Sequence, residues 1–155
     1  MAQNLYEYLY EQGVDLHIEP SSASGRPDMV SVRVGDERLI ADAKVFGPET
    51  RKAYVGQGFR QVYQYTCDYN QAIGYLVIFN TTEKQLNFLL PATAQPLPRL
   101  TYNYKTIFFE VIDIFPHSES ASRRKQCEVV EITEQDIVGT LSPQPEKDAR
   151  LPQRH

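Results

Sequence analysis

Two segments of the chain place apolar side chains at the three- and four-residue spacing of an α-helix. In the first, residues 3–12, these side chains are Leu5, Tyr8 and Leu9. In the second, which extends to about Gln71, Val55, Phe59 and Val62 have this spacing, and Thr66 continues it. Gly13 follows the first segment where a helix C-cap commonly lies, whereas Gly56 and Gly58 fall inside the second, where each costs about 1 kcal/mol relative to alanine. The pattern predicts a short first helix and a long main helix with weakened first turns.

β-Strand patterns precede the main helix. Residues 14–18 alternate weakly between apolar and polar and predict a short strand. Residues 29–34 and 39–46 are rich in β-branched and apolar side chains, and Gly35-Asp36 between them is typical of a tight hairpin turn. We therefore expect two antiparallel strands.

The second half of the chain is also rich in strand patterns. Residues 74–80 form a continuous apolar run, and residues 85–90 are predicted to be its hairpin partner across a polar connection. Prolines between 91 and 98 indicate an irregular connection. Residues 106–115 are the most β-like run, so we expect them in the centre of a sheet or at an interface.

The last ordered elements are expected before residue 142. Residues 128–132 predict a short strand, and residues 133–136 resemble a helix start, with an end near Gly139. Residues 142–155 are a polar, proline-rich tail, which leaves a single domain over residues 1–141. The order of one helix, a β-hairpin, a long helix and three strands predicts an α/β fold with a mixed sheet.

The charge and composition exclude several classes of protein. With 41% hydrophobic and 23% charged residues, the chain is neither collagen-like, coiled-coil nor wholly disordered. Its net charge of −4 argues against coating nucleic acid through a general positive field, so such binding needs a local patch. Residues 44–60, with a net charge of +3, and the run Arg123-Arg124-Lys125 are the two candidates. An ordinary solvated charged surface is the alternative for both.

Other features bear on location and on alternative chemistry. The sequence contains no apolar run long enough to span a bilayer and no signal-peptide pattern at its start, so we expect a cytoplasmic protein without a membrane partner. Cys67 and Cys127 lack metal-type spacing and are expected to be free thiols. No cysteine or histidine has the spacing of a nucleophilic catalytic pair.

One charged pair interrupts a predicted strand. Asp42 and Lys44 are two residues apart, so they face the same side of the strand, about 6.6 Å from each other. Such a pair is costly to bury without partners or a metal ion. Metal-assisted hydrolysis of a phosphodiester needs oxygen ligands, a cation beside the phosphate and an attacking water. The alternative is a surface strand whose charged side chains face solvent.

The motifs around this pair resemble those of a known superfamily. Ser24-Gly25-Arg26-Pro27-Asp28, a hairpin and then Asp42-Ala43-Lys44 are similar to the signature of PD-(D/E)xK nucleases. The segment from Gln61 to Tyr65 matches the QxxxY motif that the recombination-nuclease branch carries on the next helix. The resemblance covers roughly half the chain. It implies a restriction-endonuclease-like fold, a mixed sheet flanked by helices, and hydrolysis of phosphodiester bonds.

The resemblance also implies a metal site. Asp28 and Asp42 would bind Mg²⁺ or Mn²⁺, with the carbonyl oxygen of Ala43 as a further ligand. Lys44 would orient the attacking water or stabilise the pentacovalent phosphate. Members often add an acid from the first helix, and three residues are candidates, the first slightly favoured: Glu7, Glu11 and Glu19.

Substrate contacts follow from the same comparison. Gln61, counted with the catalytic residues, and Tyr65 are one helical turn apart and can both face a bound strand. Three cations are expected to contact phosphates: Arg51, Lys52 and Arg60. We expect DNA rather than RNA as the substrate, and a homodimer or larger complex by analogy. The alternative function is an inactive nuclease-fold module for binding or assembly in a nucleic-acid-processing or defence complex.

The length of the hairpin turn decides whether the acids meet. A two-residue turn places Asp28 across from Ala43, pointing away from Asp42. A three-residue loop, Gly35–Glu37, places Asp28 opposite Lys44, so that all three charged groups share a face. We therefore predict the longer loop or a bulge.

Overall fold

The computed structural model describes residues 16–18, 30–34, 37–91, 97–120, 122–139 and 141, and only the backbone before Arg38. The predicted first helix, residues 3–12, and the tail, residues 142–155, lie outside the described residues. Four candidate acids lie there too: Glu7, Glu11, Glu19 and Asp28.

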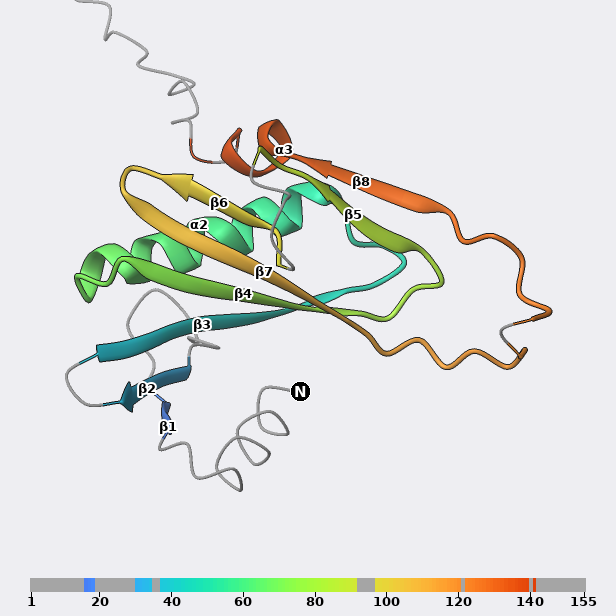
Figure 1. The fold of residues 1–155 in the computed structure, drawn as a ribbon, viewed down its shortest axis with the longest axis horizontal. Coiled ribbons are helices and arrows are strands. Elements are labelled where there is room, and N and C mark those ends of the chain that lie inside the picture. Colours follow the sequence, from blue (N-terminus) through green and yellow to red (C-terminus); the bar gives the residue numbers. More distant parts are fainter. Residues whose placement is uncertain are drawn as a thin grey trace, which may run out of the picture.

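Six strands form one mixed sheet in the order β1-β2-β3-β4-β7-β6. The strands are β1 (Leu16–Ile18), β2 (Val30–Val34), β3 (Glu37–Phe46), β4 (Ile73–Asn80), β6 (Arg99–Tyr102) and β7 (Lys105–Asp113). The central strands β3, β4 and β7 are parallel, and antiparallel strands lie on both sides of them (Figure 1). The expected α/β class and mixed sheet are confirmed.

The hairpin of β2 and β3 is confirmed, but its expected loop length is wrong. Val34 pairs with Glu37, so two residues join the strands rather than three. Gly35-Asp36 has the composition of a two-residue loop, whose twist matches that of paired strands, and no bulge is needed. The described pairing ends where Val30 meets Ala41.

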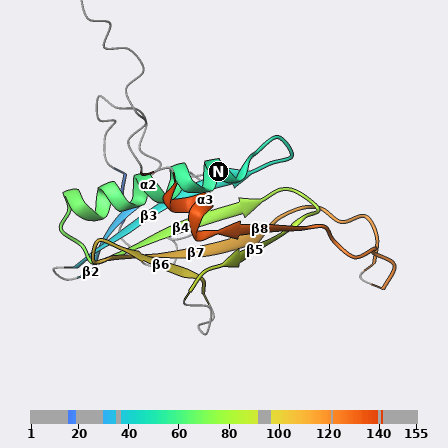
Figure 2. The same ribbon diagram turned by 90° about the horizontal axis from the view of Figure 1, so that it is seen from above.

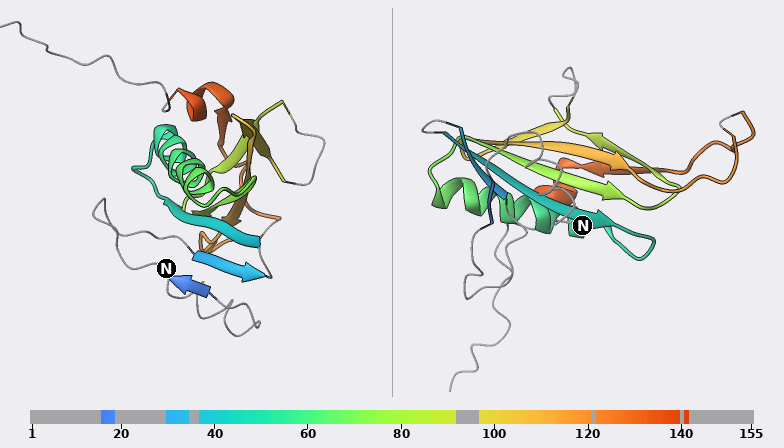
Figure 3. Two further views of the ribbon diagram at one scale, coloured as in Figure 1. Left: turned by 90° about the vertical axis from the view of Figure 1, so that its left-hand side faces the viewer. Right: turned by 90° about the horizontal axis from the view of Figure 1, so that it is seen from below.

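Helix α2 (Lys52–Asp68) covers one face of the six-stranded sheet (Figures 2 and 3). The residues predicted at helical spacing, Val55, Phe59, Val62 and Thr66, form the buried side of the helix. Gly58 is also buried, and a Cβ atom there would lie 3.0 Å from Leu76 Cδ1 and 3.1 Å from Lys44 Cγ. Glycine therefore lets the helix approach β3 and β4 closely, which explains its presence despite the cost to helix stability.

A separate two-stranded sheet corrects the second predicted hairpin. β5 (Gln85–Leu89) pairs in parallel with β8 (Val129–Thr133) and not with β4. Both edges of β4 are already occupied by β3 and β7, so no edge remains for β5. Buried Asn80 also turns the chain out of the sheet, because its amide oxygen accepts from the backbone N–H and hydroxyl of Thr82 and its amide nitrogen donates to the carbonyl of Lys84.

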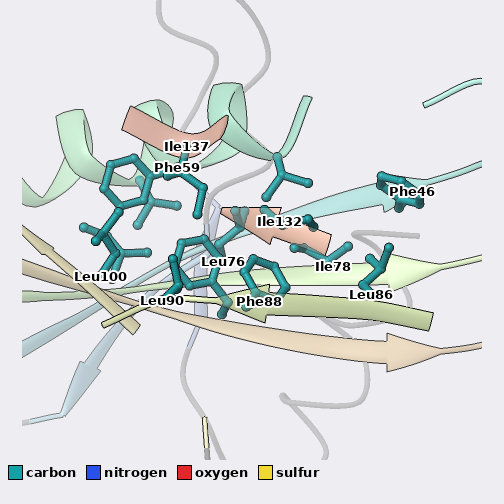
Figure 4. Packing of buried hydrophobic residues seen from close by; sticks show 14 of the residues in the cluster. Phe46, Phe59, Leu76, Ile78, Leu86, Phe88, Leu90, Leu100, Ile132 and Ile137 are labelled. Atoms are coloured by element: carbon teal, nitrogen blue, oxygen red, sulfur yellow. The ribbon is translucent and has the colours of Figure 1, made fainter. Parts of the chain in front are cut away.

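The hydrophobic core lies between the sheet, α2 and the β5–β8 pair (Figure 4). Phe109 of β7 is at its centre, with ring centroids 6.0 Å from Phe59 of α2 and 4.8 Å from Phe88 of β5. Ile132 of β8 and Ile137 of α3 (Glu134–Val138) are fully buried in the same cluster. The C-terminal elements therefore complete the core that β4 and β7 begin.

The sequence pattern missed β6, which falls between the predicted irregular connection and the predicted strand over residues 106–115. β6 pairs with β7 through a tight turn, in which Asn103 and Tyr104 have positive φ angles of 44° and 64°. The Asn103 side-chain amide donates to the hydroxyl of Tyr63 at 3.2 Å, which attaches the turn to α2. β7 is paired on both sides, so its predicted central position is confirmed.

The predicted start of the last helix is confirmed in detail. Thr133 and Asp136 form a capping box, in which each side chain bonds the backbone N–H of the other. The backbone N–H of Thr133 and then its hydroxyl lower the pKa of Asp136, and Lys52 acts in the same direction. Lys52 Nζ lies 3.9 Å from Asp136 Oδ2, so an ion pair links the starts of α2 and α3. In the described part of the chain, neither helix is long and apolar enough to cross a membrane.

Candidate active site

Asp42 and Lys44 lie on the face of β3 that packs against α2. The buried residues Ile40 and Phe46 share this face, as the two-residue period of a strand requires. Asp42 is 3% exposed, the Lys44 side chain is 11% exposed, and Lys44 Nζ lies 2.9 Å from Asp42 Oδ2. The common face is confirmed, and the alternative of a pair facing solvent is wrong.

The burial of this ion pair makes it an unusual feature of the core. Removing two charges from water costs several kcal/mol for each ion, and their attraction recovers this only with good geometry. Apolar residues of similar volume often stabilise a protein as well or better. Stability alone therefore does not account for Asp42 and Lys44 between Ile40 and Phe46.

Two contacts define how α2 runs across β3. The Cβ position of Gly58 is 3.1 Å from Lys44 Cγ, and the Arg38 guanidinium carbon lies 4.9 Å from the centre of the Tyr69 ring. Helix and strand therefore run in opposite directions. Asp42 is about 6.6 Å from Lys44 along β3, and this distance corresponds to about four residues of helix. Asp42 thus lies near the level of Gln61 and its neighbours.

The QxxxY residues lie on the side of α2 that faces β3. Gln61 and Tyr65 follow Gly58 by three and seven residues, a spacing that places all three on one flank. Gln61 is exposed, whereas Tyr65 is half-buried and packs against the core. Helix geometry therefore brings these two motif residues to the same side as Asp42 and Lys44.

The predicted phosphate contacts divide into two groups. Arg51 and Lys52 are exposed at the start of α2, beyond the end of β3. Arg60 is exposed but lies two residues after Gly58, so it projects away from the flank that faces β3. Arg60 is thus not brought to the Asp42–Lys44 pair.

Of the residues expected to bind a metal ion, the structure describes only Asp42 and Ala43. No group of three or more histidine, cysteine, aspartate or glutamate residues converges within the described residues. The described pairing of β2 stops at Ala41, so Ala43 belongs to a stretch of β3 whose one described neighbour is β4. The other carboxylates predicted to bind the metal ion, Asp28 and Glu7, lie outside the described residues.

The two cysteines agree with the expected free thiols. Cys67 and Cys127 are both exposed and form no disulfide. His117 contacts the ring of Phe115 edge to face, at 5.0 Å between ring centroids. None of these side chains belongs to the face that carries Asp42 and Lys44.

No family model, curated protein or solved structure matches this chain. The resemblance to PD-(D/E)xK nucleases therefore depends on the motif residues themselves and on their placement on β3 and α2.

Proposed function

We propose that the protein is a divalent-metal-dependent nuclease of the PD-(D/E)xK type, which hydrolyses phosphodiester bonds, most readily in DNA. The observation that carries the proposal is the buried Asp42–Lys44 pair on β3, beneath the flank of α2 that bears Gln61 and Tyr65. An α/β core with a mixed sheet and a hairpin ahead of the long helix is consistent with it.

The proposed roles follow from the chemistry of each side chain. Asp42 supplies a hard oxygen ligand, and Asp28, the Ala43 carbonyl and Glu7 are its proposed partners in holding Mg²⁺ or Mn²⁺. A bound ion of this kind supplies Lewis-acid activation of phosphate and water. Lys44 places a positive charge beside the phosphate, where negative charge increases in the transition state.

Gln61 and Tyr65 have positioning roles in this proposal. The Gln61 amide both donates and accepts hydrogen bonds, so it can hold the attacking water or a phosphate oxygen. The Tyr65 ring packs against the core on the same flank, and its hydroxyl can donate a hydrogen bond to the substrate or accept one from it. Before substrate binds, the charge of Lys44 is compensated by Asp42 at 2.9 Å.

The direct test measures cleavage with and without metal ions. Circular single-stranded DNA, circular duplex DNA and RNA are incubated with Mg²⁺, Mn²⁺ or EDTA, with wild type and Asp42→Asn. We expect metal-dependent cleavage by wild type and its loss in Asp42→Asn, since a neutral amide is a weak ligand for these ions. Asp68→Asn, which alters an exposed carboxylate at the end of α2, is the matched control. Equal cleavage by Asp42→Asn and wild type would defeat the proposal.

A second candidate function is a nuclease-fold module that binds nucleic acid without cutting it. The two-residue connection between β2 and β3 favours this alternative, because a strand continued in that register to Asp28 would face away from Asp42. The active-enzyme proposal requires the chain to leave this register before Val30. Titration with Mn²⁺ separates the two: binding that Asp42→Asn abolishes supports the enzyme, and a folded protein that binds no metal supports the module.

A further inference from the structure

A cleft of about 1020 Å³ lies at the carboxyl ends of β3, β4 and β7. Residues of three connections border it: residues 46–52 before α2, residues 81–84 before β5, and residues 115–119 and 123–128 before β8. Figure 1 shows all three at the same end of the sheet. In open α/β sheets, ligands commonly bind in a crevice just beyond the carboxyl ends of the parallel strands. The cleft thus occupies the part of the fold where a ligand is expected.

The cleft collects basic residues that are far apart in the sequence. Six of its lining side chains are lysine or arginine: Arg51, Lys52, Lys84, Arg123, Arg124 and Lys125. Three lining residues are glutamates, so the lining has a net charge of +3, whereas the whole chain has −4. Two cations of the first basic stretch, Arg51 and Lys52, therefore lie in one cleft with the second stretch, Arg123–Lys125, whereas Lys44 and Arg60 do not line it.

Most of this positive charge is not neutralised by carboxylates. Lys84 pairs with Glu128 at 3.2 Å, and Lys52 is 3.9 Å from Asp136. The four arginine and lysine side chains that remain form no ion pair within the part of the chain that the structure describes. A concave surface that concentrates such cations attracts a polyanion through a locally positive potential. The N-terminal end of α2, whose first turn contains no acidic residue, adds to this potential.

Hydrogen bonds hold the cleft walls to the ends of the strands. The backbone N–H of Thr81 donates to the Phe46 carbonyl, and that of Ile114 donates to the Asn80 carbonyl, each at 2.9 Å. The Asn80 amide also donates to Asp113 Oδ1 at 2.8 Å, which joins β4 to β7 at this edge. The cations are therefore carried on connections whose bases are fixed to the sheet.

Aromatic side chains lie in the same cleft. Half-buried Phe115 and exposed His117 line it and contact each other at 5.0 Å between ring centroids. Proteins that bind single-stranded nucleic acids combine a positive groove with aromatic rings on which unpaired bases stack. In a duplex the bases stack on one another, so the faces of their rings are not available to such side chains. The combination therefore favours a single strand.

We infer that this cleft binds a segment of single-stranded nucleic acid, with the basic side chains on its phosphates and Phe115 or His117 against a base. That the ligand is a nucleic acid rests on the proposed nuclease function. The cleft adds that the nucleic acid is single-stranded. Phe46 lines the cleft and lies two residues, about 6.6 Å, beyond Lys44 on β3. β3 therefore carries both the Asp42–Lys44 pair and, at its carboxyl end, one residue of the cleft wall.

The test is fluorescence anisotropy in EDTA, which prevents cleavage. The probes are a labelled oligo(dT) of about 12 nucleotides, the oligo(U) of equal length and the oligo(dT)·oligo(dA) duplex. Wild type is compared with Arg123→Gln/Arg124→Gln, which alters two exposed residues, and with Arg99→Gln as a control outside the cleft. We expect the double variant to bind the single strands at least tenfold more weakly. Its plot of log K against log salt should be less steep by about 1.4, at about 0.7 per lost phosphate contact.

Two further variants separate the cleft from the nuclease. Phe115→Ala should weaken binding without changing the salt dependence, since stacking is not ionic. Asp42→Asn, compared at a temperature at which circular dichroism shows it to be folded, should bind as wild type does even where it no longer cleaves, so loss of cleavage and loss of cleft binding are independent results. Equal binding by the double variant and wild type, or preference for the duplex over both single strands, would overturn the inference. If the inference holds, stronger binding of oligo(dT) identifies the ligand as single-stranded DNA, and stronger binding of oligo(U) identifies it as single-stranded RNA.

Discussion

Replacing one member of the Asp42–Lys44 pair should be far more damaging to stability than replacing both. Lys44 Nζ and Asp42 Oδ2 are 2.9 Å apart. At an effective dielectric constant of about 20, that separation corresponds to an attraction of about 6 kcal/mol. Lys44→Met removes the attraction and leaves the Asp42 carboxylate buried, so we expect a loss of about 3–5 kcal/mol in the free energy of unfolding.

The double variant Asp42→Leu/Lys44→Met tests the same reasoning from the other side. It removes both buried charges, so its stability should be within about 1 kcal/mol of wild type or above it. Urea unfolding is measured for wild type, the single variants Asp42→Leu and Lys44→Met, and the double variant. The four free energies of unfolding give the coupling energy between the two residues, provided that the m-values agree. The argument would be refuted if each single variant lost less than about 1 kcal/mol in the free energy of unfolding and the double variant lost the sum of the two. Such values are typical of a hydrated ion pair at the surface. A stable double variant without nuclease activity would indicate that chemistry, not stability, maintains the pair.

Three further predictions concern the packing of α2 and the cap of α3. Gly74→Ala places a Cβ atom 2.5 Å from Val62 Cγ1, so thermal unfolding should show a loss of about 1–3 kcal/mol. In Gly58→Ala, a gain in helix propensity of about 1 kcal/mol offsets crowding against Lys44 Cγ, so stability should change little while cleavage slows. Asp136→Asn should be less stable than wild type at neutral pH. Because the pKa of Asp136 is lowered in the folded protein, this difference should disappear as pH falls below its ordinary value of 3.8; a constant difference would contradict the cap assignment.

Local patterns predict the elements whose structure depends on their own residues. The spacing of Val55, Phe59 and Val62 places α2 correctly, and Thr133 with Asp136 identifies the start of α3 to the residue. Such signals arise from contacts within a few residues along the chain. They do not determine which strands become neighbours, because pairing depends on which sheet edges are unoccupied. The sequence pattern therefore predicts β5 as a strand but not its partner, which is β8 rather than β4.

The candidate site divides in the same way. The two-residue period of β3 is sufficient to place Asp42 and Lys44 on one face, and the helical spacing of α2 is sufficient to place Gln61 and Tyr65 on one flank. The predicted hairpin register is wrong because a common face for Asp28 and Asp42 requires three loop residues, whereas Gly35-Asp36 suits a two-residue turn. The grouping of Arg51 with Arg123–Lys125 arises from three connections that meet at one sheet edge, which no local pattern predicts.

The parallel pairing of β5 with β8 has a consequence for the order in which the protein becomes complete during its synthesis. Leu86 and Phe88 emerge from the ribosome before β6, β7 and the strand that pairs with β5. Until Ile132 and Ile137 have been made, the nascent chain exposes an apolar strand with an unpaired edge, a feature that promotes association between chains. Parallel pairing across such a separation also forms slowly. The interval before β8 appears is therefore when a chaperone would be most useful to this protein.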